Sequence, residues 1–194
     1  PTSMTRFPTI TTDDSGNPIV AFMKIDSPNP DARWLVSVSN DFGTSFQSPV
    51  LASGWSSPTS EVCDCCPGSI VSSGNSIFMI YRDNNNDIRD TWVGVSTDLG
   101  NSFTSGVDLE NQNWLLNSCP ASGPDAVIIG DTLYSTFMNG KSGTNEVFYS
   151  KLSLYGFSVP TMIKLTGNIS GLIQQNYPRI SKYGNAMSII WVQN

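Results

Sequence analysis

The side chains best suited to chemistry are four cysteines: Cys63, Cys65, Cys66 and Cys119. An even number favours disulfides, and four cysteines allow three connectivities. Adjacent residues of an extended chain point to opposite sides, so Cys65 and Cys66 are not expected to bond each other, and we expect one of them to reach Cys119. A four-thiolate metal site is the weaker alternative, because Cys-x-Cys-Cys lacks the two-residue gap of common zinc knuckles. Free thiols are the third possibility. We therefore expect disulfides, no bound metal and an oxidising compartment.

The composition excludes several classes of function. The 194 residues include no histidine, which rules out Ser-His-Asp catalysis, Cys-His catalysis and His-ligated metals. Sixteen acidic residues against ten basic ones give a net charge of −6, which argues against nucleic acid or an anionic membrane as a partner. No apolar run approaches the ~20 residues of a membrane-spanning helix. The chain opens without the basic and apolar regions of a signal peptide, so we interpret it as a mature product or a piece of a longer protein.

Two short motifs suggest a ligand or a modification, and each has a simpler interpretation. The run Asp83–Asp87 (Asp-Asn-Asn-Asn-Asp) alternates oxygen ligands as calcium loops do, but Ile88 stands where the loop glycine belongs and Gly94 where the bidentate glutamate belongs. We expect an exposed, asparagine-rich turn there and no cofactor, with calcium as the alternative. Asn168–Ser170 (Asn-Ile-Ser) is a glycosylation sequon, a triplet common by chance.

Two matching octapeptides, Ser39–Phe46 and Ser96–Phe103, indicate an internal repeat. Both read Ser-x-Asp-x-Gly-x-Ser-Phe, and Asp98 follows Asp41 by 57 residues. Each octapeptide follows an alternating strand, which predicts a hairpin turn. In such a turn the aspartate accepts hydrogen bonds from backbone N–H groups, the glycine adopts a positive φ, and the phenylalanine folds back into the core. The residues expected to define the two turns are Ser39, Asp41, Gly43 and Phe46, then Ser96, Asp98, Gly100 and Phe103.

Four prolines begin similar segments at a nearly constant period. Pro8, Pro67, Pro124 and Pro178 are spaced by 59, 57 and 54 residues, and each is followed by a turn and an apolar strand. Short strands in repeating sets of four predict the blades of a β-propeller. We therefore expect an all-β fold with four-stranded antiparallel blades at about 4–55, 60–115, 119–168 and 175–194, the last incomplete. The strands expected after each first strand are 18–24, 34–38, 48–52, 76–82, 91–95, 106–109, 132–138, 146–150, 161–165 and 186–192.

About three and a half blades do not close a propeller, and open strand edges invite pairing. We expect the chain to be part of a six- or seven-bladed propeller, or to be completed by a neighbouring chain.

The twin turns resemble the Asp-box, or BNR repeat, of sialidase-like β-propellers, where the box is structural and remote from the catalytic face. Residues 60–140 are similar to secreted bacterial exo-α-sialidase homologues of undefined role. An ordered series carries this second resemblance: Cys63–Pro67, Tyr81–Asn85, Ile88–Asp90, the second turn and Cys119-Pro120. The resemblance implies the propeller fold and a secreted or cell-surface location.

The resemblance also implies candidate site residues. Sialidases hold the substrate carboxylate with three arginines, each able to offer a bidentate fork. Arg6-Phe7-Pro8 resembles the Arg-Ile-Pro phrase that carries one of them, and Arg82 and Arg179 are the other candidates for reaching the central funnel. Asp31, or alternatively Asp26, stands where the family keeps its acid/base aspartate. The alternative for each arginine is an ion pair with a nearby aspartate.

The rest of a sialidase site is not evident. The family nucleophile is a tyrosine activated by a glutamate. Tyr177 is the best-placed tyrosine, but Glu61, Glu110 and Glu146 stand in no matching phrase. The leading hypothesis is a secreted or surface-attached module that binds glycans or protein partners through its central face, and that is not an enzyme by itself. The alternatives are an exo-α-sialidase with part of its site outside this chain, and a structural subunit of a larger assembly.

Overall fold

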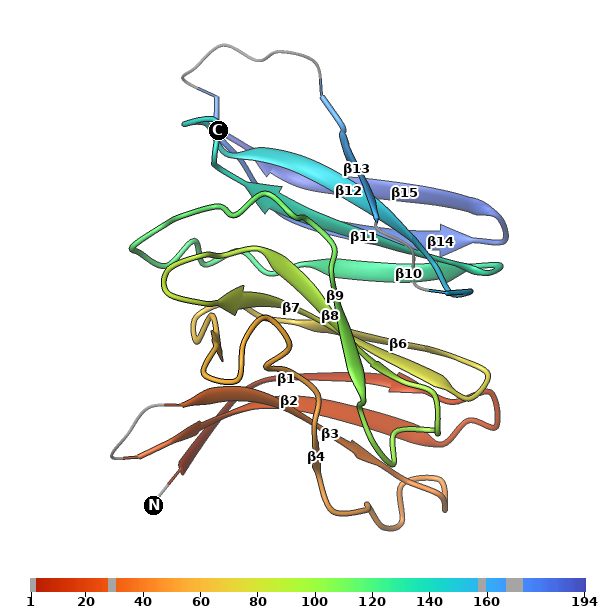
Figure 1. Ribbon diagram of the computed structural model, residues 1–194. Helices are drawn as coiled ribbons and strands as arrows, with labels where there is room; N and C mark the ends of the chain where they lie inside the picture. Colours follow the sequence, from red (N-terminus) through yellow and green to blue (C-terminus); the bar gives the residue numbers. More distant parts are fainter. Residues whose placement is uncertain (1–2, 28–30, 157–159, 167–172) are drawn as a thin grey trace.

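The computed structural model describes residues 3–27, 31–156, 160–166 and 173–194, and all fifteen regular elements in these ranges are β-strands (Figure 1). They form four antiparallel sheets. Sheet 1 contains β1 (Ser3–Thr12), β2 (Pro18–Asp26), β3 (Ala32–Val38) and β4 (Val50–Leu51). Sheet 2 contains β6 (Ser69–Ser73), β7 (Ser76–Asn84), β8 (Thr91–Ser96) and β9 (Ser105–Asp108), with β5 (Glu61–Val62) paired to the far end of β7. Sheet 3 contains β10 (Asp125–Ile129), β11 (Thr132–Asn139), β12 (Glu146–Ser153) and β13 (Thr161–Lys164). Sheet 4 contains β14 (Gln175–Tyr183) and β15 (Ala186–Gln193).

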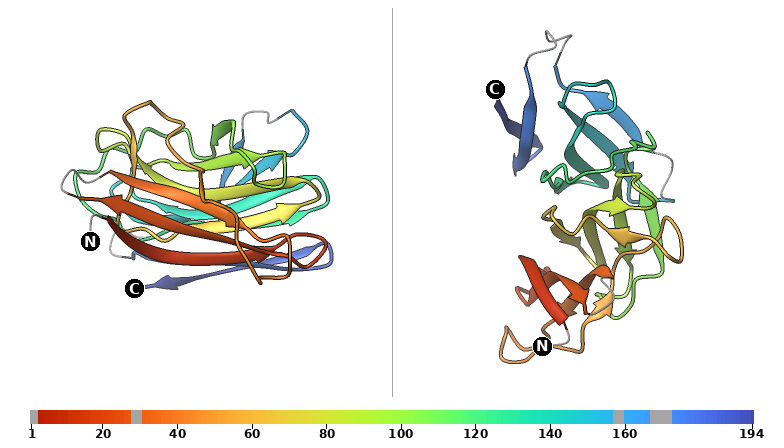
Figure 2. Two further views of the ribbon diagram at one scale, coloured as in Figure 1. Left: turned by 90° about the horizontal axis from the view of Figure 1, so that it is seen from below. Right: turned by 90° about the vertical axis from the view of Figure 1, so that its left-hand side faces the viewer.

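The four sheets follow one another along an arc, and each is a simple meander (Figure 2). The first strands of neighbouring sheets lie side by side, with β6 between β1 and β10, and β10 beside β14. This arrangement is that of consecutive blades of a partial propeller and confirms the predicted fold class. In the described part of the chain, three sheets have the full set of four meandering strands and the fourth has two.

Two hydrophobic cores hold the sheets together. On β7, Ile77, Met79 and Tyr81 face sheet 1, whereas Phe78 and Ile80 face sheet 3. These side chains are at most 1% exposed, so β7 is buried on both faces. Each fully buried apolar side chain contributes about 1.5–3 kcal/mol. The remaining members of the first core include Ile19, Met23, Trp34, Val36 and Phe103, and those of the second include Val93, Val95, Ala126, Leu133 and Leu152.

The two octapeptides form turns with the same hydrogen bonds. In the first, the Ser39 hydroxyl donates to Asp41 Oδ1 (2.8 Å) and accepts from the Gly43 N–H (2.8 Å). Asp41 also accepts from the backbone N–H (2.8 Å) and hydroxyl (2.6 Å) of Ser45. These bonds lower the pKa of Asp41, the Ser45 hydroxyl contributing most. The same four bonds recur at 2.6–2.9 Å in the second turn, between the residues Ser96, Asp98, Gly100 and Ser102.

The backbone of these turns is left-handed over two residues. Gly43 and Gly100 have φ values of 88° and 81°, as expected, and the preceding Phe42 and Leu99 are also left-handed at 56° and 57°. Two successive positive φ values fit the twist of a hairpin.

The two phenylalanines that end the octapeptides differ in their surroundings. Phe103 is 8% exposed and packs in the core between sheets 1 and 2, as predicted. Phe46 is 46% exposed, so its predicted return to the core is wrong. It lies beside Val20 and Phe22 on the face of sheet 1 that no described strand covers. The difference arises because sheet 1 packs on the equivalent face of sheet 2, whereas none of the described sheets packs on that face of sheet 1.

Two expectations concern other parts of the chain. The sequon Asn168–Ser170 falls outside the described residues. In the described ranges, no helix has the length and apolar character needed to cross a membrane.

Candidate functional site

The candidate site lies at the end of the sheets where the first strands begin, which we call the strand-start end. A β-bulge marks it in sheets 1 and 4, where the pairing shifts between Arg6 and Thr9 and between Asn176 and Arg179. Each bulge contains a left-handed aromatic residue followed by a proline, which cannot donate to the ladder: Phe7 has φ 50° and Tyr177 has φ 53°. Arg6 thus corresponds in position to Asn176, and Arg179 to Thr9.

Arg6 projects from this end with much of its side chain in solvent. The side chain is 40% exposed, and its Nη1 donates to the Asp64 carbonyl (3.2 Å) and lies 4.0 Å from the Asp64 carboxylate. Thr5, Arg6, Pro8, Val20 and Phe22 line a cavity of about 340 Å³ on the open face of sheet 1. Arg6 thus borders an apolar cavity, and its partly exposed side chain has only a weak ion pair.

Two carboxyl groups from neighbouring sheets, those of Asp31 and Glu61, lie near this end. Asp31, directly before β3, forms an ion pair with Arg33 Nε at 2.7 Å. Burial raises the pKa of Glu61 on β5, and the negative charge of Asp31 adds to that rise. Asp26, the alternative acid/base candidate, pairs with Lys24 at 2.9 Å. Of the two candidate aspartates, Asp31 is the one whose charge affects the pKa of a second carboxyl group, that of Glu61.

Arg82 does not line an exposed funnel, in contrast to the prediction from the resemblance. Its side chain is wholly buried, and it donates to the carbonyls of Ser122 (3.1 Å), Met138 (2.6 Å) and Arg89. Nη1 lies 3.6 Å from the buried Glu110 carboxylate, and the guanidinium stacks over Trp114 at 5.2 Å. Arg82 thus links sheet 2 to sheet 3, because its hydrogen-bond partners belong to both sheets and their connections.

Arg179 lies exposed on β14, where its Nη1 donates to the Pro178 carbonyl at 3.0 Å. The three arginines therefore have three different environments: Arg6 half in solvent before a bulge, Arg179 exposed after one, and Arg82 buried. Of the three predicted carboxylate ligands, Arg6 and Arg179 are accessible.

Three buried acids around Arg82 have roles that the sequence did not indicate. Burial raises the pKa of Glu110 to about 7 despite the opposing charge of Arg82. Burial likewise raises the pKa of Asp83, which accepts a hydrogen bond from Ser56, to about 7. Asp90 accepts hydrogen bonds from three successive backbone N–H groups, those of residues 112–114. Hydrogen bonds to these acids stabilise the irregular connections between sheets, where backbone groups have no partner in a neighbouring strand.

The run Asp83–Asp87 forms a tight turn whose two aspartates point to different partners. Asn86 and Asp87 are left-handed, and the Asp87 N–H donates to Asn84 Oδ1 at 3.2 Å. Asp83 is buried, whereas Asp87 is paired with Arg89 at 3.4 Å. The predicted turn is present but less exposed than expected, and the expectation that it holds no cofactor, with calcium as the alternative, stays a prediction.

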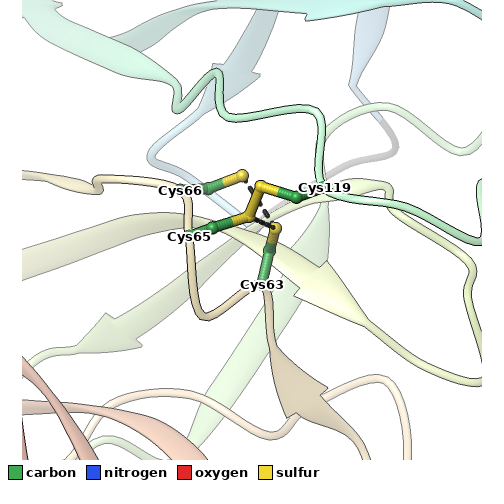
Figure 3. A group of neighbouring side chains, drawn as sticks. All are labelled: Cys63, Cys65, Cys66 and Cys119. Carbon is green, nitrogen blue, oxygen red and sulfur yellow. Dashed lines mark hydrogen bonds between the residues drawn. A yellow bond between two sulfur atoms is a disulfide. The ribbon is translucent and has the colours of Figure 1, made fainter.

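The four cysteines converge between the beginnings of sheets 2 and 3 (Figure 3). Cys65 and Cys119 form a disulfide, which confirms that one of the adjacent pair reaches Cys119. Cys63 and Cys66 are buried and lie outside that bond, with their sulfurs 2.7 Å apart. All four sulfurs lie within 4.8 Å of one another. A four-thiolate metal site would require Cys65 and Cys119 as thiolates, so the disulfide and such a site exclude each other.

The comparisons with known proteins identify the fold. No protein-family model and no curated protein matches the sequence. A protein of unknown function from Dyadobacter fermentans matches with a TM-score of 0.68 and 12% identity, over 95% of this chain and 48% of its own. An α-L-arabinanase from Penicillium chrysogenum, complexed with arabinobiose, gives 0.64 and 13%, over 96% and 58%. An endosialidase of phage phi92 gives 0.59 and 14%, over 84% and 26%.

This chain therefore spans only part of the length of these structures, between 26% and 58%. At such low identity the similarity establishes the propeller-type fold alone.

Proposed function

We propose that the chain is part of a secreted or surface-attached, sialidase-like propeller that binds acidic glycans through its strand-start end. The observation that carries the proposal is Arg6, whose side chain is 40% exposed and which is one of the residues that line an apolar cavity. A guanidinium binds a carboxylate through two parallel hydrogen bonds, and an apolar wall suits the carbon face of a sugar ring. Arg179, the fifth residue of β14, is another accessible cation on a first strand.

Three further observations support this assignment. The arabinanase and the endosialidase, whose fold this chain shares in part, act on sugars according to their names. The matching turns around Asp41 and Asp98 agree with an Asp-box scaffold. The Cys65–Cys119 disulfide suits a chain that folds in an oxidising compartment.

A glycan array probed with the full-length gene product tests the proposal. We expect binding to glycans that carry sialic or uronic acids, and loss of that binding in Arg6→Ala. Lys151→Ala is the matched control, because Lys151 is an exposed cation on β12 that lies over Tyr134 and Tyr149. A wild-type protein that binds no acidic glycan, or an Arg6→Ala variant with the wild-type pattern, would reject it.

Glycoside hydrolysis is the second candidate, and the Asp31–Glu61 pair favours it. Glycosidases use two carboxyl groups, one of which acts as the acid, and burial together with the charge of Asp31 raises the pKa of Glu61. The assay is turnover of fluorogenic sialosides and arabinofuranosides by the full-length protein. Turnover that falls in both Glu61→Gln and Arg6→Ala is expected, and unchanged turnover in these variants discards this candidate.

A further inference from the structure

The group of four cysteine sulfurs is the strongest feature without an assigned role, because the Cys63 sulfur contacts two other sulfurs with which it could form a disulfide. Cys63 Sγ lies 2.7 Å from Cys66 Sγ and 3.4 Å from Cys65 Sγ, and Cys65 is already bonded to Cys119. Figure 3 shows the Cys63 and Cys66 side chains converging on that disulfide from either side. A thiol in contact with both a second thiol and a disulfide has the arrangement from which disulfide exchange proceeds.

The backbone brings Cys63 and Cys66 together. The Cys66 N–H donates to the Cys63 carbonyl at 3.1 Å, which closes a four-residue turn. The ends of a β-turn lie less than about 7 Å apart at Cα, which is within the range that a disulfide can bridge. The two thiols are thus placed for bond formation without movement of the sheets.

We propose that Cys63 and Cys66 receive oxidising equivalents from the Cys65–Cys119 disulfide by internal exchange and become a second, buried disulfide. Cys63 Sγ attacks Cys65 Sγ, the Cys63–Cys65 bond forms, and Cys119 leaves as a thiolate. Cys66 Sγ then attacks Cys63 Sγ, the Cys63–Cys66 bond forms, and Cys65 leaves as a thiolate. The two protons lost by Cys63 and Cys66 go to the two leaving sulfurs. One disulfide has been exchanged for another, and no external electrons are needed.

The protonation of the pair favours Cys63 as the attacking group. The hydrogen bond from Cys66 lowers the pKa of Cys63, and the same bond raises the pKa of Cys66. The positive charges of Arg89 and Arg82 also favour the Cys63 thiolate. A thiolate is the reactive form in exchange.

Exposure determines where an outside oxidant enters. Cys119 is exposed and Cys65 partly so, whereas Cys63 and Cys66 are 0% and 1% exposed. A small-molecule disulfide such as oxidised glutathione therefore reaches Cys65 and Cys119 first. It takes their two electrons and protons, becomes two thiols and restores the Cys65–Cys119 bond. The end state has two disulfides, one buried and one linking sheets 2 and 3.

The test compares two variants that both lose the inter-sheet bridge. The native protein is reduced, exposed to oxidised glutathione, quenched with N-ethylmaleimide at intervals and mapped by mass spectrometry. In wild type we expect both disulfides. Cys65→Ser, which removes the sulfur that Cys63 contacts, should slow oxidation of the buried pair about tenfold. Cys119→Ser is the matched control and should oxidise that pair at near the wild-type rate, because Cys65 can still pass on a mixed disulfide.

Several outcomes would overturn the proposal. Equal rates in the two variants would show that Cys65 is not the relay. The second disulfide would be excluded if Cys63 and Cys66 of the oxidised wild-type protein could still be alkylated after unfolding. One zinc ion per chain in native mass spectrometry would instead establish a thiolate metal site. If the variants do not fold, the test is made on the reduced wild-type protein, which is given one equivalent of oxidised glutathione and mapped in the same way. A single Cys63–Cys66 bond in part of the molecules supports exchange, and Cys65–Cys119 alone refutes it.

Discussion

Replacing Asp83 by asparagine should abolish a pH-dependent loss of stability. The carboxyl group is 1% exposed, and burial raises its pKa from the ordinary value of 3.8 to about 7. In the folded state the neutral acid is favoured, so its contribution to stability is fully present below pH 3.8 and is lost as the pH rises through about 7. The two pKa values differ by about three pH units, and each unit corresponds to about 1.36 kcal/mol, which gives about 4 kcal/mol.

Asparagine keeps the shape and the acceptor for the Ser56 hydroxyl but cannot ionise. The free energy of unfolding of Asp83→Asn minus that of wild type should therefore rise by about 4 kcal/mol between pH 4 and pH 8. Urea denaturation followed by tryptophan fluorescence at several pH values measures this difference. Asp131→Asn, which removes an exposed carboxylate from the turn between β10 and β11, controls for net charge. A difference that stays constant with pH would refute the reasoning.

The remaining predictions concern the packing of sheet against sheet, and denaturation measures all of them. Arg82→Met should cost about 3–5 kcal/mol because it leaves the Glu110 carboxylate buried without its cation. Adding Glu110→Met should recover part of this loss, since the three carbonyls that Arg82 serves still lack a donor; a double variant as unstable as the single one would contradict the pairing. Phe103→Ala should cost about 3–5 kcal/mol, while Phe46→Ala, at the twin position but 46% exposed, should cost less than about 1 kcal/mol; equal losses would contradict the asymmetry. Gly123→Ala should cost about 3 kcal/mol or more, since a Cβ there would lie 1.8 Å from the Pro67 carbonyl oxygen; near-wild-type stability would show that the backbones move apart easily.

The strands and twin turns were predictable because their signals are local. Alternating apolar residues followed by Ser-x-Asp-x-Gly-x-Ser specify a strand and a hydrogen-bonded bend within about a dozen residues. All ten strands predicted after the first strands overlap observed ones, and no end differs by more than three residues. The local pattern fails at Phe46, whose octapeptide matches that of Phe103, because burial depends on whether a neighbouring sheet is present.

The candidate site was less predictable because its contacts are distant in sequence. The partners of Arg82 include Ser122 and Met138, 40 and 56 residues away, and no local pattern distinguishes such an arginine from one that faces solvent. One signal was present: Arg82 directly follows five apolar residues of β7 with no polar alternation, a pattern typical of burial on both faces. Arg6 and Arg179 lie on either side of equivalent bulges, Arg6 before one and Arg179 after the other. A bulge changes the pairing register of the strand and the direction of its side chains, and the spacing of the prolines does not predict this change.

The cysteine prediction succeeded in part for a geometric reason. Opposite orientation of neighbouring side chains correctly separated Cys65 from Cys66 and predicted that one of them bonds to Cys119; the structure shows that it is Cys65. The approach of Cys63 to Cys66 depends on a turn closed by one backbone hydrogen bond, and the Cys-Asp-Cys-Cys sequence contains no glycine to indicate that turn.

The measurement that bears most directly on the central claim is the affinity of the full-length protein for an acidic oligosaccharide, determined by calorimetry for wild type, Arg6→Ala and Lys151→Ala. A charge-assisted bidentate contact is worth about 1.5–3 kcal/mol, so Arg6→Ala should bind at least about tenfold more weakly, while Lys151→Ala stays within about twofold of wild type. Equal affinities for all three proteins would contradict a glycan site at the strand-start end.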